Sequence, residues 1–335
     1  MIEYNSILFT NINLIYFVMF ALILSLAFDL IFGELPARIH PVVVMGSVIN
    51  FFKRMFIGIK NRFSGLFLYL ACCIVLSIVL YLIYLIISVN VILFIVIFII
   101  LLSSTFSVKM LLSTARDVED ALNESIEKAR ELVSYLVSRN TDELTESFIV
   151  SAAIESMTEN ITDSYVAPVF YYFIFSLVLL YFNVNNILFY LLLIPMIYRL
   201  SNTLDAMVGY ENDELRDIGY VPAKMDDILN YIPARISGLY VVLSAYLLKL
   251  DGKNAFRVMM RDARNSPSPN SGYTMASAAG ALNIRLVKKD TYILGDENKP
   301  IEVNDIEKAV NLSKLTIILF TITIILLLIL IYVIL

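Results

Sequence analysis

The sequence predicts an all-α integral membrane protein with about six transmembrane helices, whose helical cytoplasmic-side loops form a polar site. Of its 335 residues, 59% are hydrophobic and 16% are charged, and the mean hydropathy is +0.79. A soluble domain usually has about a quarter of its residues charged. The charged residues here also cluster between apolar runs. No basic stripe with interleaved aromatic residues occurs, so nucleic acid is not an expected partner.

Apolar runs of about 17–25 residues are long enough to cross a bilayer as a helix, and they define the predicted spans. One stretch, 165–200, is too long for a single span and is interrupted by NVNN at 183–186, which predicts a hairpin of two helices. The run at 236–250 is shorter, and we expect it to lie in the interface or to re-enter. The predicted spans are 14–33, 66–87, 91–108, 165–182, 187–200 and 315–335.

The distribution of Lys and Arg predicts which loops of this single membrane domain, residues 1–335, face the cytoplasm. The loop 34–65 carries five of these residues, whereas the short loops 88–90 and 183–186 carry none. A further span at 236–250 would export the basic residues that follow it, so that run is not expected to cross the cell membrane. The predicted cytoplasmic segments are 34–65, 109–164, 199–235 and 251–314.

The segment between the third and fourth spans is expected to be helical. Apolar residues repeat at spacings of three and four through 108–137, which predicts that this segment continues the third span as a helix. SRNT at 138–141 is a break, with Asn140 or Thr141 as the N-cap of a second helix from about 142 to 163.

Three carboxylates precede the fourth span at steps of four residues. Glu155, Glu159 and Asp163, which we call the acid ladder, would share one face of a helix, and like charges at that spacing repel by about 0.2–0.5 kcal/mol per pair. Acids beside a membrane span are costly and usually functional. The sequence therefore favours metal or phosphate chemistry at the ladder, with Asn160 beside it, over a plain solvated helix face.

A second polar cluster covers 198–237. Asn202 and Asp205 lie three residues apart, and a further group of acids and an amide follows them. Basic residues are close by, so the acids either form ion pairs or bind Mg²⁺ in a site where Arg and Lys hold a phosphate. The further group is Asp226, Asp227 and Asn230, and the basic residues are Arg199, Lys224 and Arg235.

Two other polar stretches complete the set of candidates. GELPARIHPVVVMG at 33–46 predicts a turn after the first span and contains the single histidine, His40, which excludes a multi-histidine zinc site. Oxygen ligands would then bind any metal, and these are typical of Mg²⁺. The loop 264–275 is rich in Pro, Ser, Asn and Gly, so it is either an anion-binding loop ahead of a helix from near Thr274 or a plain loop. Its candidate residues are Ser268, Asn270, Ser271 and Gly272.

Six stretches combine into one pattern: Asp29 and Gly33 through HPVVVMG, ARDVEDAL at 115–122, IESMTENITDSYVAPVF at 154–170, NTLDAMVGY at 202–210, MDDILNYIPARI at 225–236 and SPNSGYTMASAAGAL at 268–282. In this order they resemble the membrane-bound adenosylcobinamide-phosphate synthases of cobalamin biosynthesis, the CobD/CbiB family. The likeness covers about residues 25 to 295. The chain departs from the family pattern at Ser266, where His is common, and at Val287 and Lys288, which replace a glycine pair.

The resemblance implies an amide-forming reaction. Adenosylcobyric acid would condense, through its free carboxylate, with (R)-1-amino-2-propanol O-2-phosphate to give adenosylcobinamide phosphate. ATP with Mg²⁺ would drive the reaction by phosphorylating the carboxylate before the amine attacks it. The expected partners are this corrinoid, the aminoalcohol phosphate and membrane lipid. A second copy of the chain or other enzymes of the pathway are further candidates.

We assign roles on this basis. The expected catalytic residues are Glu155, Glu159, Asp163 and Asp205. The expected Mg²⁺ ligands are Glu155, Glu159, Asp163, Asp205, Asp226 and Asp227. The expected substrate- and phosphate-binding residues are His40, Arg139, Asn160, Asn202, Lys224, Asn230, Arg235, Ser268, Asn270, Ser271 and Gly272.

Two other functions compete with this one. The spacing of Asn202 and Asp205, and the pair Asp226 and Asp227, resemble the acidic motifs of Mg²⁺-dependent membrane prenyltransferases, although the acids are fewer here. The same superfamily also contains AmpE-like membrane proteins, described as non-catalytic sensors. Retention of the full set of acids argues against that alternative.

Overall fold

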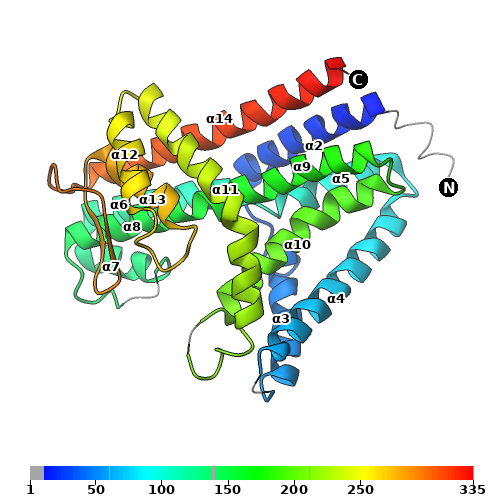
Figure 1. Ribbon diagram of the computed structural model, residues 1–335, viewed down its shortest axis with the longest axis horizontal. Coiled ribbons are helices and arrows are strands. Elements are labelled where there is room, and N and C mark those ends of the chain that lie inside the picture. Colours follow the sequence, from blue (N-terminus) through cyan, green and yellow to red (C-terminus); the bar gives the residue numbers. More distant parts are fainter. Residues whose placement is uncertain (1–10, 60, 138–139, 211, 335) are drawn as a thin grey trace. The chain divides into compact units, whose positions relative to one another are not determined.

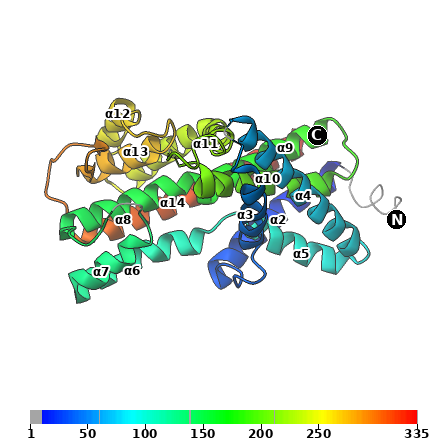
Figure 2. The same cartoon turned by 90° about the horizontal axis from the view of Figure 1, so that it is seen from below.

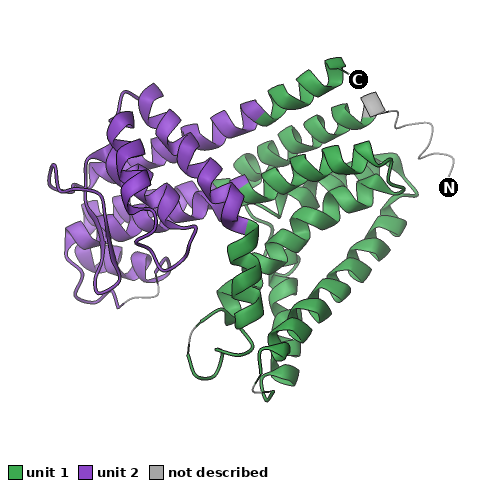
Figure 3. Ribbon diagram, viewed as in Figure 1, with its two compact units in different colours: residues 1–108, 167–229, 324–335 green, residues 109–166, 230–323 purple. Residues whose placement is uncertain are grey.

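The computed structural model describes residues 11–59, 61–137, 140–210 and 212–334. Within them, helices make up nearly all of the regular structure, together with one two-stranded sheet. The chain divides into two compact units, which Figure 3 shows in different colours. Unit 1 comprises Met1–Val108, Ala167–Leu229 and Ile324–Leu335, and unit 2 comprises Lys109–Val166 and Asn230–Thr323.

Seven helical segments of the described chain are long and apolar enough to cross a membrane, which confirms the predicted all-α membrane fold. Each of the six predicted spans overlaps one of them. The additional segment contains most of the run 236–250 within a continuous helix of 28 residues. Its interfacial or re-entrant placement stays a prediction. The segments are Leu14–Phe32, Phe63–Ile87, Val91–Glu124, Glu146–Tyr181, Ile187–Val208, Tyr220–Leu247 and Asn304–Ile334.

Unit 1 consists mainly of apolar helices joined by short turns (Figure 1). The predicted hairpin of two spans is present, because the chain turns at 182–186 between α9 and α10. The helices of this unit are α2 (Asn11–Phe32), α3 (Pro41–Phe56), α4 (Phe63–Ile87), α5 (Val91–Ser103), α9 (Ala167–Tyr181), α10 (Ile187–Val208), the residues of α11 (Tyr220–Leu247) up to Leu229, and those of α14 (Asn304–Ile334) from Ile324 onward.

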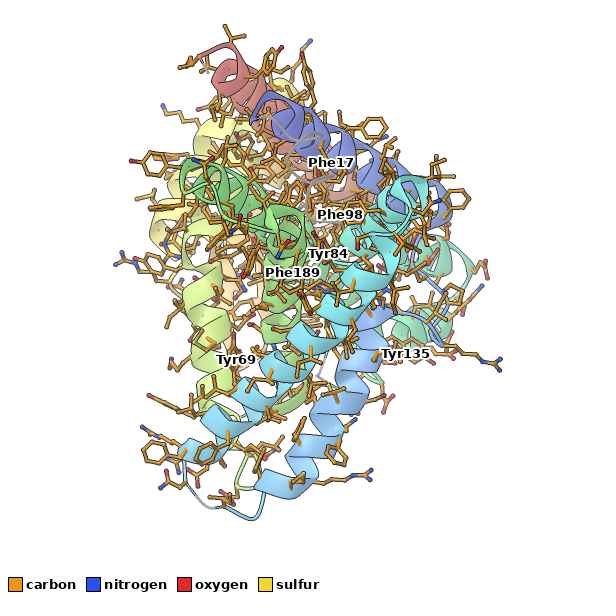
Figure 4. The ribbon with its side chains drawn as sticks, turned by 90° about the vertical axis from the view of Figure 1, so that its right-hand side faces the viewer. Phe17, Tyr69, Tyr84, Phe98, Tyr135 and Phe189 are labelled. Carbon is orange, nitrogen blue, oxygen red and sulfur yellow. The ribbon has the colours of Figure 1, made fainter. Side chains whose placement is uncertain are left out.

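Aromatic side chains fill the contacts between four helices of unit 1, as Figure 4 shows. The ring of Phe17 on α2 lies edge-on to that of Phe98 on α5, with centroids 5.0 Å apart. The rings of Tyr84 on α4 and Phe189 on α10 are 5.8 Å apart. Such pairs contribute about 0.5–1.5 kcal/mol each beyond the area that they bury. Ring packing therefore fixes how these apolar helices meet.

Unit 2 contains the polar segments and the sheet. α12 and α13 pack against each other, which both views show (Figures 1 and 2), and the hairpin of β1 and β2 contacts α8 and α13. Its elements are α6 (Val108–Glu124) from Lys109 onward, α7 (Ile126–Ser134), α8 (Glu146–Ile161), α12 (Gly252–Asp262), α13 (Gly272–Leu282), β1 (Leu286–Lys288), β2 (Tyr292–Leu294), and parts of α11 and of α14 (Asn304–Ile334).

The prediction that 108–137 continues the third span as one unbroken helix is wrong. α5 ends at Ser103, and 104–107 interrupt the helix before α6 begins. A second break follows at Ser125, whose side chain accepts a hydrogen bond from the backbone N–H of Lys128 and so caps α7. Serine side chains compete with the helical backbone in this way. The apolar repeat continues across both breaks and therefore hid them.

The next helix also begins later than predicted. Thr145 holds the N-cap position of α8, so neither Asn140 nor Thr141 does. Asn140 instead accepts a hydrogen bond from the N–H of Asp142 at 2.9 Å, which forms a local turn before the helix. The polar segment 199–235 is largely helical, as predicted for the segments between the spans, because α10 continues to Val208 and α11 begins at Tyr220.

Candidate functional site

Glu155 is a buried carboxylate of α8 whose two oxygens both accept hydrogen bonds from hydroxyl groups. Ser151 donates to Oε1 at 2.6 Å, and Tyr292 of β2 donates to Oε2 at 2.9 Å. The residue is 3% exposed. These donors matter because a buried acceptor without a partner costs about 1–3 kcal/mol. Ser151 also accepts a hydrogen bond from the N–H of Val287 at 3.0 Å, so the same residues attach the hairpin to α8.

Glu159 lies one turn further along α8, beside a hydroxyl group and a cation. The Ser271 hydroxyl and the Lys288 ammonium are both near enough to stabilise the negative charge of its carboxylate. Asp163 and Glu155 repel it. Lys288 therefore supplies positive charge that offsets the repulsion within the acid ladder.

The register of the hairpin explains why a lysine reaches this place. Lys288 is opposite Tyr292 and Leu286 is opposite Leu294 in the antiparallel pair. Opposite residues, and residues two apart in a strand, share one face of a sheet. Leu286 and Leu294 are fully buried, and β1 contacts α8. The face that buries the leucines therefore carries Lys288 and Tyr292 toward the ladder.

Asp163 lies in a π-helical turn, Thr162–Val166, between α8 and α9. Such turns are rare and frequently occur at functional sites. The regular step of four residues therefore holds from Glu155 to Glu159, and the backbone is wider at Asp163. The side chain of Asn160 donates to the carbonyl oxygen of Ser156 at 2.8 Å, within the same helix.

Arg235 of α11 contacts the loop 264–275, which the sequence offered as an anion-binding loop. Its guanidinium donates to Oδ1 of Asn270 at 3.0 Å. It also lies over the rings of Tyr231 and Tyr273, at 3.5 and 4.4 Å from their centroids. Arg is well suited to such stacking because its cation is planar and weakly hydrated. The loop thus keeps a positive group beside its amide and hydroxyl side chains.

Serine hydroxyls and one glycine shape the rest of this loop. Ser266 donates to the carbonyl oxygen of Ser268 at 2.8 Å, and its hydroxyl lies 2.9 Å from that of Ser271. Gly272 opens α13, and a Cβ atom there would lie 2.0 Å from the carbonyl oxygen of Ala263. Close packing of the backbone therefore accounts for the glycine.

Unit 1 holds the other group of acids and amides. Nδ2 of Asn202 on α10 lies 3.4 Å from Oδ1 of Asp226 on α11. Lys224 and Asp227 form an ion pair of 3.0 Å one turn apart on α11, as the ion-pair interpretation expects. The fold thus brings together two motifs that are 24 residues apart in the sequence.

Asp205 lies at the end of α10, against a glycine. The N–H of Gly209 donates to the carbonyl oxygen of Asp205 at 2.7 Å. A Cβ atom on residue 209 would lie 2.0 Å from Oδ1 of Asp205. Any larger residue at 209 would therefore displace the carboxylate, which is one reason for a glycine at a close approach.

His40 caps α3 and is nearly buried. Its Nδ1 accepts a hydrogen bond from the N–H of Val42 at 3.2 Å, which requires an unprotonated nitrogen. Burial lowers the pKa of His40, and Arg199 lowers it further, while Glu34 opposes them. The environment thus favours the neutral imidazole that caps the helix.

The predicted residues fall into two groups. Unit 2 holds Glu155, Glu159, Asn160, Asp163, Asn230, Arg235, Ser268, Asn270, Ser271 and Gly272, and unit 1 holds His40, Asn202, Asp205, Lys224, Asp226 and Asp227. Arg139 lies outside the described residues. The convergence of the six acids on one site stays a prediction.

The acid ladder does not form a metal cage. Across the part of the chain that the structure describes, no group of three or more Asp, Glu, His or Cys side chains is arranged to hold a metal ion. Mg²⁺ often binds through only one or two carboxylates together with substrate phosphates. The donor chemistry of each acid group fits that mode of binding.

The region that contains these residues matches a known family. The family model described as CobD/Cbib protein matches residues 22–313. The chain belongs to the CobD/Cbib family. A probable cobalamin biosynthesis protein CobD from Methanothermobacter thermautotrophicus is 44% identical over 300 residues, which cover 90% of this chain and 94% of that protein.

Two other CobD proteins show how far the similarity reaches. A probable cobalamin biosynthesis protein CobD from Methanocaldococcus jannaschii is 36% identical, with 88% of this chain and 92% of that protein covered. The cobalamin biosynthesis protein CobD from Dehalococcoides mccartyi is 34% identical, with 83% and 87% covered. No solved structure matches the chain.

Sequence reasoning missed three residues of this candidate site: Ser151, Tyr292, and Lys288 as a neighbour of the ladder. The sequence does indicate a hairpin here, because two short apolar stretches, LVK at 286–288 and YIL at 292–294, are separated by three residues. Lys288 also stood where the chain departs from the family pattern. Nothing in a linear pattern indicates that this hairpin packs on α8, because that contact joins residues 136 and 137 positions apart.

Proposed function

We propose that this CobD/Cbib chain acts in cobalamin biosynthesis and joins adenosylcobyric acid to (R)-1-amino-2-propanol O-2-phosphate through an amide bond. Membership of the family supports the pathway, because the curated relatives carry the name cobalamin biosynthesis protein CobD. The observation that supports the reaction is the surroundings of Glu159, where acids, a cation and a hydroxyl group meet in unit 2.

The aminoalcohol phosphate carries an ammonium group and a phosphate on neighbouring carbons. Carboxylates are the natural partners of an ammonium group, and cations and hydroxyls are those of a phosphate. Glu159 and Asp163 would take the ammonium end, while Lys288 and Ser271 would take the phosphate. One compact cluster thus offers complementary groups for both ends of the small substrate.

The amine must lose a proton before its lone pair can attack a carbonyl carbon. In our proposal a carboxylate oxygen of Glu159 accepts that proton. Neighbouring acids and partial burial both make a carboxylate hold a proton more readily, which suits a general base. The Ser271 hydroxyl and the Lys288 ammonium would hold the side chain in place.

Mg²⁺ enters the proposal from the oxygen ligands of the acid groups, and ATP enters it from the family resemblance. Asp205 and Asp226, with Asn202 beside Asp226, would hold the ion. Lys224, which is paired with Asp227, would supply positive charge for the phosphate. When bound, the magnesium nucleotide would supply the phosphoryl group that activates the corrinoid carboxylate. Arg235 would add positive charge at the loop 266–271 in unit 2.

A reconstituted assay tests the reaction. The purified chain in lipid nanodiscs is incubated with adenosylcobyric acid and the aminoalcohol phosphate, with ATP and Mg²⁺ added or withheld. We expect a mass increase equal to the aminoalcohol phosphate less one water, and we expect it only when ATP and Mg²⁺ are present. Absence of this product, together with failure to rescue an auxotroph that requires cobinamide phosphate, would refute the synthase and favour an AmpE-like role.

We further propose that the polar segments face the cytoplasm of a multi-pass cell-membrane protein. The membrane-type helices support the multi-pass placement, and the distribution of Lys and Arg supports the orientation. A variant with both native cysteines replaced and one introduced by Ser268→Cys tests it. In intact cells a membrane-impermeant maleimide should leave this cysteine unlabelled until the membrane is opened.

A further inference from the structure

The segment between the first two spans has an unusual charge pattern. From Leu35 to Arg62 the chain has five Lys and Arg residues and no acid, and the next acid downstream is Asp117. The nearest acid upstream is Glu34. A cluster of cations without acids beside a membrane span is attracted to anionic surfaces.

Most of this segment forms α3, which has apolar side chains on two sides. Met45 and Ile49 are buried, and α3 contacts α4 and α10. The other side leaves large apolar side chains uncovered, of which Phe51 is 62% and Met55 is 58% exposed. Val43 and Val44 are also exposed.

The cations lie at the C-terminal end of the same helix. Lys53 and Arg54 occupy its last turn, and Arg54 is exposed. Arg62 follows α3 and stacks over Tyr220 at 3.9 Å from the ring centroid. Within unit 1, α3 leaves the end of α2 at a steep angle in Figures 1 and 4. It does not continue the direction of that span.

We propose that α3 lies along the membrane surface, with Phe51 and Met55 in the outer part of the acyl region and Lys53 and Arg54 on anionic lipid headgroups. A helix with an exposed apolar face and neighbouring cations binds lipid by both forces at once. Charge complementarity selects anionic lipid as the occupant, because a second copy of this segment would bring five more cations to the same contact.

The absence of tryptophan from the chain allows a direct test of the depth of α3. A Phe51→Trp variant in nanodiscs should lose fluorescence to lipids brominated near the headgroup and be shielded from acrylamide in water. Tyr135→Trp is the control, since Tyr135 is 75% exposed at the end of α7 and should show the opposite response. Equal acrylamide quenching of the two variants would overturn the proposal. Shielding of Phe51→Trp from both quenchers would do so as well, because it would place a protein copy on α3.

A second measurement tests the choice of lipid. Native mass spectrometry compares phosphatidylglycerol with phosphatidylcholine retained by the chain and by a Lys53→Gln, Arg54→Gln variant. We expect the preference for the anionic lipid to fall about fivefold for each cation removed. A variant with Lys253→Gln and Lys289→Gln, two exposed lysines of unit 2, should keep the preference. An unchanged preference in the α3 variant would overturn anionic binding there, whatever the result of the synthase assay.

Discussion

The hydroxyl of Tyr292 lies 2.9 Å from Oε2 of Glu155, although the two residues are 137 positions apart in the sequence. This hydrogen bond joins β2 to α8 at the start of the acid ladder. Together with the bond from Val287 to Ser151, it holds the hairpin where Lys288 can act on Glu159. The surroundings of the ladder are therefore built by two segments, α8 and the hairpin, rather than by one helix.

Removal of the Tyr292 hydroxyl should weaken both stability and function. The Tyr292→Phe variant leaves one oxygen of the buried Glu155 without this donor, and the expected loss is about 1–3 kcal/mol of unfolding free energy. We expect a lower melting temperature in detergent and a several-fold lower turnover. Tyr135→Phe is the control, because that residue is largely exposed. Equal behaviour of the two variants would mean that the Glu155 contact is unimportant.

Substitution of the two neighbouring lysines of the hairpin should have sharply different effects on KM. Lys288→Gln removes the cation beside Glu159, and we expect a raised KM for the aminoalcohol phosphate because its phosphate loses a partner. Lys289 is exposed at the turn, so Lys289→Gln should leave KM unchanged. Steady-state kinetics with varied aminoalcohol phosphate measures the difference. A normal KM for Lys288→Gln would remove this residue from the phosphate site.

A single methyl group should be enough to disturb Asp205. The Cβ atom of a Gly209→Ala variant would lie 2.0 Å from Oδ1 of Asp205, so the carboxylate has to move. We expect a stability loss of about 1–3 kcal/mol and a marked loss of turnover. Gly58→Ala is the matched control, because nothing lies within 4 Å of its Cβ position. Full activity in Gly209→Ala would show that the position of Asp205 is not critical.

Stability should depend on pH through His40. Its pKa is lowered in the folded protein from an ordinary value of 6.5, so below about pH 6.5 the unfolded chain takes up a proton that the folded chain resists. Stability should therefore fall as the pH drops below that value. His40→Asn keeps an N-cap acceptor without titrating, so its melting temperature should fall less. Parallel curves of melting temperature against pH for both proteins would contradict this.

The apolar pattern of the sequence predicted six of the seven helices of the described chain that are long and apolar enough to cross a membrane. The runs 66–87 and 91–108 contain almost no competing signal, so hydropathy alone locates α4 and the start of α5 closely, although α5 ends at Ser103, five residues before the predicted span does. The breaks at 104–107 and Ser125 were missed because local capping by polar side chains interrupts a helix without changing its apolar period. The π turn at Asp163 has no sequence signature that reasoning by period can detect.

The candidate site was predictable in its residue types and less so in its contacts. The acids and amides of α8, α10 and α11 stand out because most residues of this chain are hydrophobic. The cation that offsets the ladder was not predicted, since Lys288 reaches Glu159 only through the pairing of β1 with β2. Likewise, the role of Arg235 as a clamp depends on stacking against two tyrosine rings that no spacing rule indicates.

The most direct test of the central claim, that both acid groups serve one reaction, uses Glu159→Ala and Asp205→Ala in nanodiscs. Each variant should insert and fold normally and yet show no turnover, since each lacks a proposed catalytic carboxylate. Glu146→Ala and Asp213→Ala, which change exposed acids of the same units, should keep wild-type turnover. Near wild-type turnover in either Glu159→Ala or Asp205→Ala would contradict the claim and remove that acid group from the reaction.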